Sequence, residues 1–191
     1  MPRPTRKAAI LDAAVDLFAN KGYHATTVRD IAGGSGMLSG SLYAHIESKE
    51  DLLFEIVASA AEQFTAAVAP IVGGPGAAAD KLRRAMAAHV RVVAADLSAA
   101  TVFLHEWRAL SPERQAAAAA LRDRYEALLG DIITQGVVSG EFRPVDQKFA
   151  RLLVLSAVNW LYMWYRPGGE LAPEAVAERL AVLILQGLES P

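Results

Sequence analysis

The sequence predicts an all-α fold with two unequal domains, and three observations support this. Apolar residues recur with the 3.6-residue period of an amphipathic helix in nearly every segment. We find no convincing pair of strands joined by a tight hairpin turn. The 191 residues are enough to bury a substantial core. Hydrophobic residues make up 53% of the chain and its mean hydropathy is +0.23, which indicates an interface or a lined pocket in addition to the core.

Two helices are expected at the start of the chain. The first runs from about Thr5 to Asn20 and ends at Gly22, because glycine readily adopts the left-handed conformation that closes many helices. The second begins at Thr27, whose hydroxyl is placed to cap the backbone, and its length is only about two turns. Asp30 lies where a negative charge favours the helix start.

A third helix follows a glycine-rich break around Ser35. It begins near Leu38 or Ser39 and ends at about Ile46. Two short helices joined by a glycine turn are the frame of a helix-turn-helix.

Longer helices make up the rest of the chain. Ser48 is expected to cap a helix that continues to about Val72, before a Gly/Pro-rich loop at residues 73–76. Ser111 and Pro112 are typical of a cap and a first helical residue. The further helices are expected at about 77–96, 98–110, 112–139, 146–166 and 173–188.

The composition narrows the compartment and the chemistry. Cysteine is absent, which excludes disulfides, thiolate metal sites and cysteine nucleophiles. No window approaches the roughly 18 uninterrupted apolar residues of a membrane span, and the start lacks an apolar signal-peptide core. We therefore expect a cytoplasmic protein without a membrane partner.

Charge is unevenly distributed along the chain, whose formal net charge is −2. Residues 1–46 hold five basic side chains, including an arm with Arg3, Arg6 and Lys7, against three acidic ones. The remainder holds 14 basic and 18 acidic side chains. A modestly basic first segment joined to an acidic body suits a small DNA-contacting module on a larger domain.

Residues 26–49 carry the strongest functional pattern. One face of the third helix is small and polar, which lets its backbone approach base edges in a major groove. Tyr43 and His45 are placed to reach flanking phosphates, as are Thr27 and Lys49 at two helix starts. The expected DNA contacts are Thr27, Leu38, Ser39, Gly40, Ser41, Tyr43, His45 and Lys49.

An ordinary helical corner is the alternative interpretation of this segment. Tyr43 would then be half-buried, His45 solvated and the serines would only cap a helix. Packing alone does not explain the ordered succession of a basic arm, a helix, a glycine turn and a helix of small residues.

At these residues the chain resembles the TetR family of one-component bacterial repressors. The resemblance covers residues 6–55, with departures at Ala44, Ile46 and Glu47 that bear on base preference. It implies nine helices, a dimer whose last two helices form a four-helix bundle, and an effector that moves the two DNA-reading parts apart. The positions typical of the family are Phe18, Gly22, Thr26, Thr27, Ile31, Ala32, Gly36, Leu42, Tyr43, Lys49 and Leu52.

On this basis we expect a helix-turn-helix domain at residues 1–48 and a ligand-binding and dimerisation domain at residues 49–191. The helices at 146–166 and 173–188 both carry wide apolar faces, which predict a two-fold interface or, alternatively, an intramolecular core. These faces include Phe149, Leu152, Leu153, Val158 and Trp160, and Val176, Leu180, Leu183, Ile184 and Leu188.

The middle helices are expected to enclose a small, apolar effector. The stretches 105–108, 141–144 and 164–169 look like those of actinobacterial TetR-type repressors of lipid and sterol catabolism, several of which respond to acyl-CoA thioesters. That resemblance implies an apolar tunnel with Arg108 and Arg166 near its mouth, although both arginines could instead close loops. The candidate lining residues are His89, Phe103, His105, Glu106, Trp107, Arg108, Asn159, Trp160, Tyr162, Met163, Trp164 and Arg166.

An enzyme and a structural adaptor are the two alternative classes of protein. An enzyme is not expected, and neither is a cofactor, because the sequence has no phosphate-binding glycine loop and no His-Glu-x-x-His motif. His105 and Glu106 are adjacent in sequence, and neighbouring side chains diverge by about 100° on a helix, so the two would not easily share a catalytic site. A purely structural helical adaptor would leave the basic arm unused, and it would tolerate changes at Tyr43 or Lys49 that a repressor would not.

Overall fold

The structure is a computed structural model that describes residues 5–188, without the side chain of Leu188. Arg3 of the expected basic arm therefore lies outside the described residues, and so does the side chain of Leu188 from the expected apolar face.

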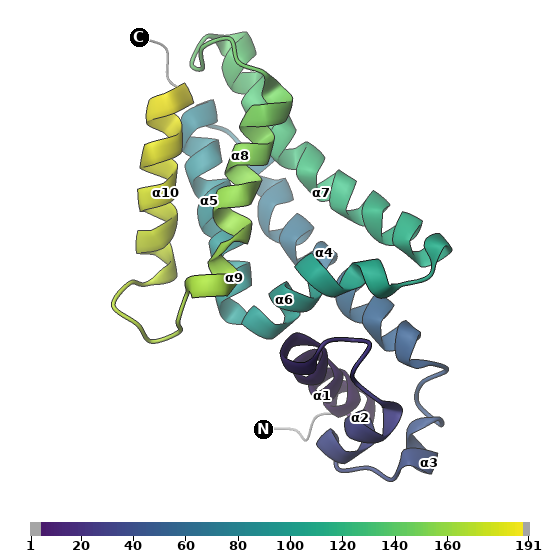
Figure 1. Cartoon of the computed structure of the whole chain (residues 1–191). Coiled ribbons are helices and arrows are strands. Elements are labelled where there is room, and N and C mark those ends of the chain that lie inside the picture. The colour runs from purple at the N-terminus through teal and green to yellow at the C-terminus, as the bar shows by residue number, and fades with distance from the viewer. Residues whose placement is uncertain (1–4, 189–191) are drawn as a thin grey trace. The chain divides into compact units, whose positions relative to one another are not determined.

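All regular secondary structure within residues 5–188 is helical and none of it is a strand, which confirms the all-α prediction (Figure 1). Counting α8 and α9 as one interrupted helix, residues 5–188 hold the expected nine α-helices, with the short 3₁₀ helix η1 after α6. The elements are α1 (Arg6–Lys21), α2 (Val28–Gly34), α3 (Ser39–Leu42), α4 (Lys49–Gly73), α5 (Ala78–Ala95), α6 (Leu97–His105), η1 (Glu106–Ala109), α7 (Pro112–Ser139), α8 (Gln147–Asn159), α9 (Leu161–Trp164) and α10 (Pro173–Leu188).

Contacts divide the chain into two compact units. The N-terminal unit comprises Met1–Ala60 and Leu97–Ala120, and the C-terminal unit comprises Ala61–Asp96 and Leu121–Pro191. This division differs from the expected boundary after residue 48. The reason is that α1 packs against α6, so a segment from the middle of the chain belongs with the first three helices.

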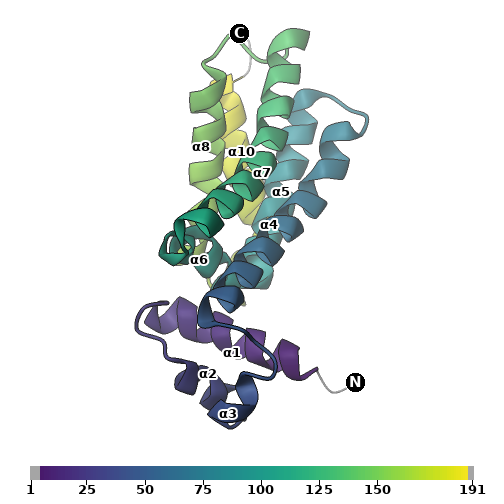
Figure 2. The same ribbon diagram turned by 90° about the vertical axis from the view of Figure 1, so that its right-hand side faces the viewer.

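Within the N-terminal unit, α1, α2 and α3 form a small cluster around a shared core (Figure 2). Ile10 and Phe18 of α1, Ile31 of α2 and Leu42 of α3 are completely buried. Each such side chain contributes roughly 1.5–3 kcal/mol through its burial. The two short helices therefore depend on α1 for their stability.

Local signals set the ends of the first two helices, as predicted. The Thr5 hydroxyl accepts a hydrogen bond from Ala8 N–H, and Gly22 closes α1 with φ = 85° and a bond from its N–H to Phe18 O. Thr27 and Asp30 form a reciprocal capping box at the start of α2. An ion pair with Lys21 and the bonds to Thr27 lower the pKa of Asp30 to about 2.

The third helix is shorter than predicted. α3 ends at Leu42, and the chain continues as turns to Ile46 instead of as a regular helix. Ile46 N–H still bonds to Leu42 O, and both side chains are buried. The two residues therefore anchor a tight, partly helical segment whose outer side is exposed.

The C-terminal unit is built around α5, which packs against α8, α9 and α10 (Figure 1). Leu82, Met86 and Val93 of α5 are buried, as are Val154 of α8 and Leu185 of α10. The expected helix at 146–166 is interrupted at Trp160, which ends α8 and precedes α9. Backbone bonds from Met163 to Trp160 and from Tyr165 to Leu161 carry the chain across this break.

Helix α4 is long and apolar. It has 25 residues and contains an 18-residue stretch with a mean hydropathy of 1.4, which meets the length and composition of a membrane span. Leu53, Val57, Phe64 and Val68 of this helix are nevertheless buried within the chain. A core helix of a soluble protein meets the same criterion, so we interpret α4 as a core helix.

A close approach between α7 and the turn after it leads to a stability prediction. A Cβ atom added at Gly136 would overlap the ring of Phe142, which is completely buried and cannot easily move. We expect Gly136→Ala to lower the free energy of unfolding by about 1–3 kcal/mol, measured by denaturant titration.

Gly130→Ala is the matched control on the same helix. Its added Cβ would lie 3.7 Å from Arg151 Cδ, an ordinary contact, and alanine favours a helix over glycine by about 1 kcal/mol. We expect this variant to be as stable as the parent or more stable. Equal losses in the two variants would contradict the packing argument.

Candidate nucleic-acid interface and ligand site

The small polar residues of α3 lie on an exposed surface of the N-terminal unit. Ser39, Gly40 and Ser41 are exposed, and the flanking Leu38 and Tyr43 are 80% and 59% exposed. We call Leu38–Tyr43, without the buried Leu42, the α3 surface. Leu38 and Tyr43 thus flank the small polar residues on a surface that is open to solvent.

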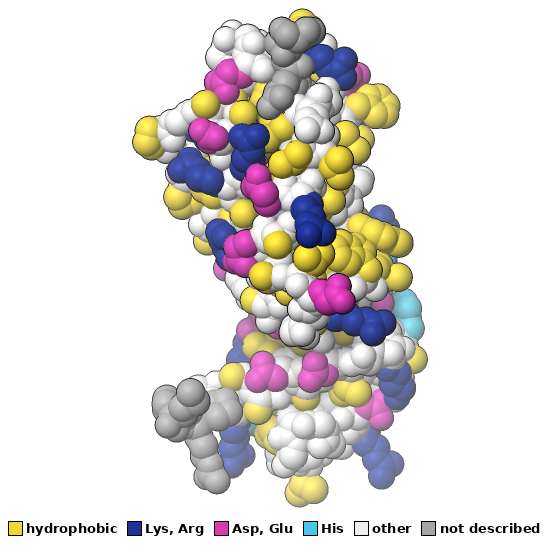
Figure 3. Space-filling view, turned by 90° about the vertical axis from the view of Figure 1, so that its left-hand side faces the viewer, with side chains coloured by type: hydrophobic (Ala, Val, Ile, Leu, Met, Phe, Trp, Pro, Cys, Tyr) yellow, Lys and Arg dark blue, Asp and Glu magenta, His cyan; other side chains and the backbone are white. Residues whose placement is uncertain are grey.

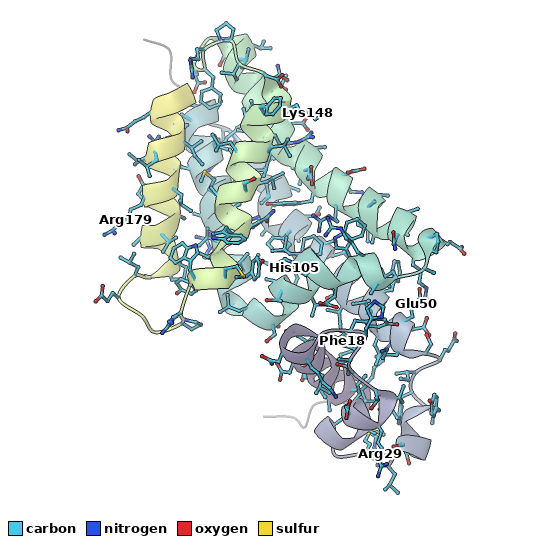
Figure 4. The ribbon with its side chains drawn as sticks, in the orientation of Figure 1. Phe18, Arg29, Glu50, His105, Lys148 and Arg179 are labelled. Atoms are coloured by element: carbon cyan, nitrogen blue, oxygen red, sulfur yellow. The ribbon has the colours of Figure 1, made fainter. Side chains whose placement is uncertain are left out.

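Other residues of this unit border the α3 surface with polar or basic groups. A shallow hollow of about 340 Å³ is lined by Arg6 of α1, residues 35–38 and Ser41. Thr27 is exposed, His45 is half-buried, and Arg29 of α2 points away from the helix cluster (Figure 4). The arrangement suits contact with a polyanion.

Lys49 has a structural role that sequence reasoning missed. Its Nζ donates hydrogen bonds to Tyr23 O at 2.8 Å and Thr26 O at 2.7 Å, and it lies 4.1 Å from the centre of the Tyr23 ring. Burial lowers the pKa of Lys49 from its ordinary value. Two of its three N–H donors therefore hold the loop between α1 and α2, and the expected phosphate contact stays a prediction.

Carboxylates connect the first 60 residues to residues 97–120 within the N-terminal unit. Glu106 accepts a hydrogen bond from Tyr23 N–H at 2.8 Å, and Glu50 accepts one from Ser111 N–H at 2.8 Å. Asp51 pairs with Arg114. The bonds from Ser111 lower the pKa of Glu50, and those from Ser48 and Arg114 lower the pKa of Asp51.

Among the expected ligand residues, His89 has the most distinctive position. It is 1% exposed in the C-terminal unit, and its ring is stacked on Phe64 with 4.6 Å between centroids. Its Nδ1 lies 2.5 Å from the Tyr125 hydroxyl. Burial lowers the pKa of His89 to about 3, which the Asn159 side chain opposes, so the ring is neutral at physiological pH.

The remaining expected ligand residues are divided between the two units. In the N-terminal unit Phe103 is buried, Trp107 and Glu106 are half-buried, and His105 and Arg108 are exposed. In the C-terminal unit Asn159 and Tyr162 are half-buried. The exposed ones there are Trp160, Met163, Trp164 and Arg166.

The four exposed residues of the C-terminal unit, Trp160, Met163, Trp164 and Arg166, do not line an enclosed pocket in this structure. Trp160 is 58% and Met163 57% exposed, and the two lie on the same side of the α8–α9 segment as Phe149 and Leu153. Figure 3, which looks onto the side of α10, shows hydrophobic side chains gathered on this part of the C-terminal unit. These side chains have the character of an interface.

Two hollows in the C-terminal unit were not anticipated from the sequence. One, of about 600 Å³, lies between α8 and α10 and is lined by Phe149, Leu153 and Leu183 among others. The other, of about 300 Å³, lies between α4 and α7, with Ala61, Ala66 and Leu121 on its walls and Arg124 at its edge. No group of three or more His, Asp or Glu side chains suited to a metal occurs within residues 5–188.

Two family models match the chain. Residues 10–56 match the family described as bacterial regulatory proteins, tetR family, and residues 75–188 match the one described as tetracyclin repressor-like, C-terminal domain. The chain belongs to the TetR family.

The chain is similar to transcriptional regulators over nearly the full length of both proteins. The HTH-type transcriptional repressor KstR2 of Rhodococcus jostii is 32% identical over 188 residues, which cover 97% of this chain and 92% of that protein. The TetR family regulator PfmR of Thermus thermophilus is 40% identical with a TM-score of 0.86, covering 95% of this chain and 99% of that one. AibR, solved with isovaleryl coenzyme A and operator DNA, is 30% identical with a TM-score of 0.85, covering 93% and 97%.

These relationships establish the class of protein. The chain is a TetR-type transcriptional repressor with an N-terminal helix-turn-helix, as its sequence predicted. The family consists of DNA-binding regulators, which confirms that the chain is not an enzyme.

The structural role of Lys49 leads to a prediction. Lys49→Met keeps the aliphatic stem but removes the two bonds to Tyr23 O and Thr26 O. Because both acceptors are partly buried, we expect the free energy of unfolding to fall by about 1–3 kcal/mol, measured by denaturant titration.

Lys21→Met is the control for loss of a lysine charge. Lys21 forms an ion pair with Asp30 at 2.7 Å, and both side chains are well exposed to solvent. Solvent screens such pairs, so we expect a smaller loss of stability than in Lys49→Met. If the two variants lost stability equally, the loop would not depend on the Lys49 bonds.

Proposed function

We propose that this repressor binds a near-palindromic operator as a homodimer and releases it when a small apolar effector binds the C-terminal unit. The observation that carries the proposal is the exposed α3 surface, held by buried Leu42 and Ile46, in a chain of a DNA-binding family. The proposed DNA contacts are Thr27, Leu38, Ser39, Gly40, Ser41, Tyr43, His45 and Lys49.

The contacts divide into base readout and positioning. Ser39, Gly40 and Ser41 bring little bulk to the α3 surface, so the backbone approaches base edges closely in the major groove. Thr27, Tyr43 and Lys49 would bind phosphates and set the register without reading sequence. Two α3 surfaces related by a two-fold axis would enter successive major grooves, roughly 34–36 Å apart.

The dimer is proposed to form through α8 and α10. Both helices present exposed apolar side chains in the structure, including Phe149 at 68% and Leu183 at 69%. The 600 Å³ hollow between these helices would accept side chains of the second copy, since a two-fold interface uses the same surface twice. The exposed Trp160 and Met163 extend this face along α9.

The effector is proposed to be an acyl-CoA thioester. Support comes from AibR, which was solved with isovaleryl coenzyme A. The match to AibR covers 93% of this chain. The buried His89 and the half-buried Asn159 near it in the C-terminal unit are our main candidates for contact with the effector. An effector that binds better to a state in which the two α3 surfaces are too far apart shifts the population and releases DNA. A cytoplasmic location follows from this role.

A salt titration of DNA binding tests the proposal. The full chain would be titrated with the DNA upstream of its own gene, with and without acyl-CoA thioesters. Tight, salt-sensitive and sequence-selective binding that a thioester abolishes is the expected result. Binding that no thioester alters would remove the effector from the proposal, and a lack of selective binding at low salt would refute operator recognition.

The α3 surface leads to a sharper prediction with Gly40→Leu. A Cβ atom added at Gly40 meets no atom within 4 Å and the position is exposed, so the variant should fold normally while projecting bulk toward the DNA. We expect selective operator affinity, measured by fluorescence anisotropy, to fall by about tenfold or more, because losing one good base contact costs roughly 1–3 kcal/mol.

Gly33→Leu is the matched control, because Gly33 on α2 is also exposed and open. It should retain operator binding. Normal binding by Gly40→Leu would show that α3 does not approach the bases.

The proposed interface predicts a dimer that breaks when charge is placed on it. Leu183→Lys puts an ammonium group on the α8–α10 face, where burying it against a second copy is costly. We expect sedimentation velocity to detect monomers, together with a loss of operator affinity.

Val138→Lys is the control, since Val138 on α7 is 82% exposed but lies outside that face. It should remain dimeric. A Leu183→Lys protein that stays dimeric would place the interface elsewhere.

A further inference from the structure

Four helices bring one polar cluster together in the core of the C-terminal unit. Phe64 comes from α4, His89 from α5, Tyr125 from α7 and Asn159 from the end of α8. The rings of Phe64 and Tyr125 lie 5.5 Å apart, and both lie within 6 Å of the His89 ring. Phe64, His89 and Tyr125 are each at most 3% exposed. A polar group at this depth costs free energy unless its polar atoms are hydrogen-bonded.

One ring nitrogen of His89 does not meet that requirement. Nδ1 is bonded to the Tyr125 hydroxyl, but the buried Nε2 makes no hydrogen bond of normal geometry to any described residue. The Asn159 side chain raises the pKa of His89, so it lies near the ring. In the tautomer in which the Tyr125 hydroxyl donates to Nδ1, the neutral ring carries its proton on Nε2. In this tautomer the cluster ends in a buried N–H donor without a partner among the described residues.

The hollow between α4 and α7 lies along the same stretch of these helices. Its walls include Ala61, three residues before Phe64, and Leu121, four residues before Tyr125. Residues at these spacings share one face of a helix. The hollow therefore lies about one helical turn along α4 and α7 from Phe64 and Tyr125, the two rings in contact with His89.

We propose that His89 Nε2 is the recognition point of the effector site and donates a hydrogen bond to the neutral carbonyl oxygen of a ligand whose acyl part is apolar. The carbonyl of an acyl thioester has this chemistry. The inference rests on the proposed function, because it assumes that an effector enters the C-terminal unit. It goes further by assigning the atom that recognises the ligand and by excluding a class of ligands.

The excluded class is the free carboxylate. None of the four cluster residues is cationic at neutral pH, since burial keeps the His89 ring uncharged. A carboxylate would bring an unpaired negative charge into this core, which costs far more than a neutral carbonyl that accepts one hydrogen bond. The site should therefore distinguish a thioester from the acid that its hydrolysis yields.

Calorimetry on the full-length dimer tests this with defined probes. Butyryl-, octanoyl- and palmitoyl-coenzyme A would be compared with their free acids and with coenzyme A alone. We expect at least one thioester to bind and its acid and coenzyme A to bind far more weakly. In His89→Phe, which keeps a ring against Phe64, thioester affinity should fall about 10- to 100-fold, while operator affinity stays unchanged.

His24→Phe is the matched control, because His24 is exposed and lies in the N-terminal unit. It should bind the thioester normally. Asn159→Leu, which removes the amide group next to the ring, gives a second variant in case His89→Phe does not fold.

Nitrogen NMR of the unaltered protein distinguishes a ligand-binding histidine from one that only packs in the core, because only the first changes its ring-nitrogen chemical shift when the ligand binds. The His89 ring should show the Nε2–H tautomer, and its Nε2 signal should shift when the thioester is added. If a thioester binds but leaves the Nε2 signal unaltered, and His89→Phe binds it with normal affinity, the inference about His89 is overturned while the proposed function stands. Operator binding without any thioester binding would overturn it together with the proposed effector, and absence of operator binding would instead refute the proposed DNA function.

Discussion

The backbone of the short loop between α1 and α2 is the constraint on which the N-terminal unit depends. Tyr23 offers a carbonyl and an N–H group in this loop, and long side chains from two distant segments satisfy both. Lys49 binds the carbonyl together with that of Thr26, and Glu106 binds the N–H. Buried backbone groups must find partners, so the loop has little freedom to move alone. Because this loop places α2, and α2 packs on α3, the direction of the α3 surface follows from these bonds.

Pairing of side chains within the N-terminal unit also explains how a chain with a net negative charge offers a surface suited to DNA. Three acidic residues of the N-terminal unit are engaged within it: Asp30 with Lys21, Asp51 with Arg114, and Glu50 with the backbone of Ser111. Hydrogen bonds lower the pKa of each of these three carboxyl groups, which keeps them ionised as internal acceptors. Their negative charge is therefore partly neutralised locally. Counts of charged residues along the sequence reveal the basic bias of this segment but not which charges are already paired.

Helix ends were predictable because their signals are local. The first helix, expected from Thr5 to Asn20, runs from Arg6 to Lys21, and the capping residues Thr5 and Thr27 act as foreseen. The interruption at Trp160 was not predictable, since neither proline nor glycine marks it. The exposure of Ser39, Gly40 and Ser41 was also foreseen, whereas the partners of Lys49 were not. Tyr23 lies 26 residues before Lys49, and no local pattern reports a contact across that separation.

The contacts of the His89 cluster were likewise not predictable from local sequence patterns, and they bear directly on the proposed function. Its members come from four helices, so the sequence singles out His89 and Asn159 only as polar residues among apolar ones. Apolar walls alone discriminate weakly between ligands that differ by one group, because the burial of similar surfaces is worth similar free energies. A buried donor discriminates strongly, since a ligand without an acceptor leaves it unsatisfied. A hydrogen bond of this kind shifts the conformational equilibrium only when it is stronger in the state that releases DNA than in the state that binds it.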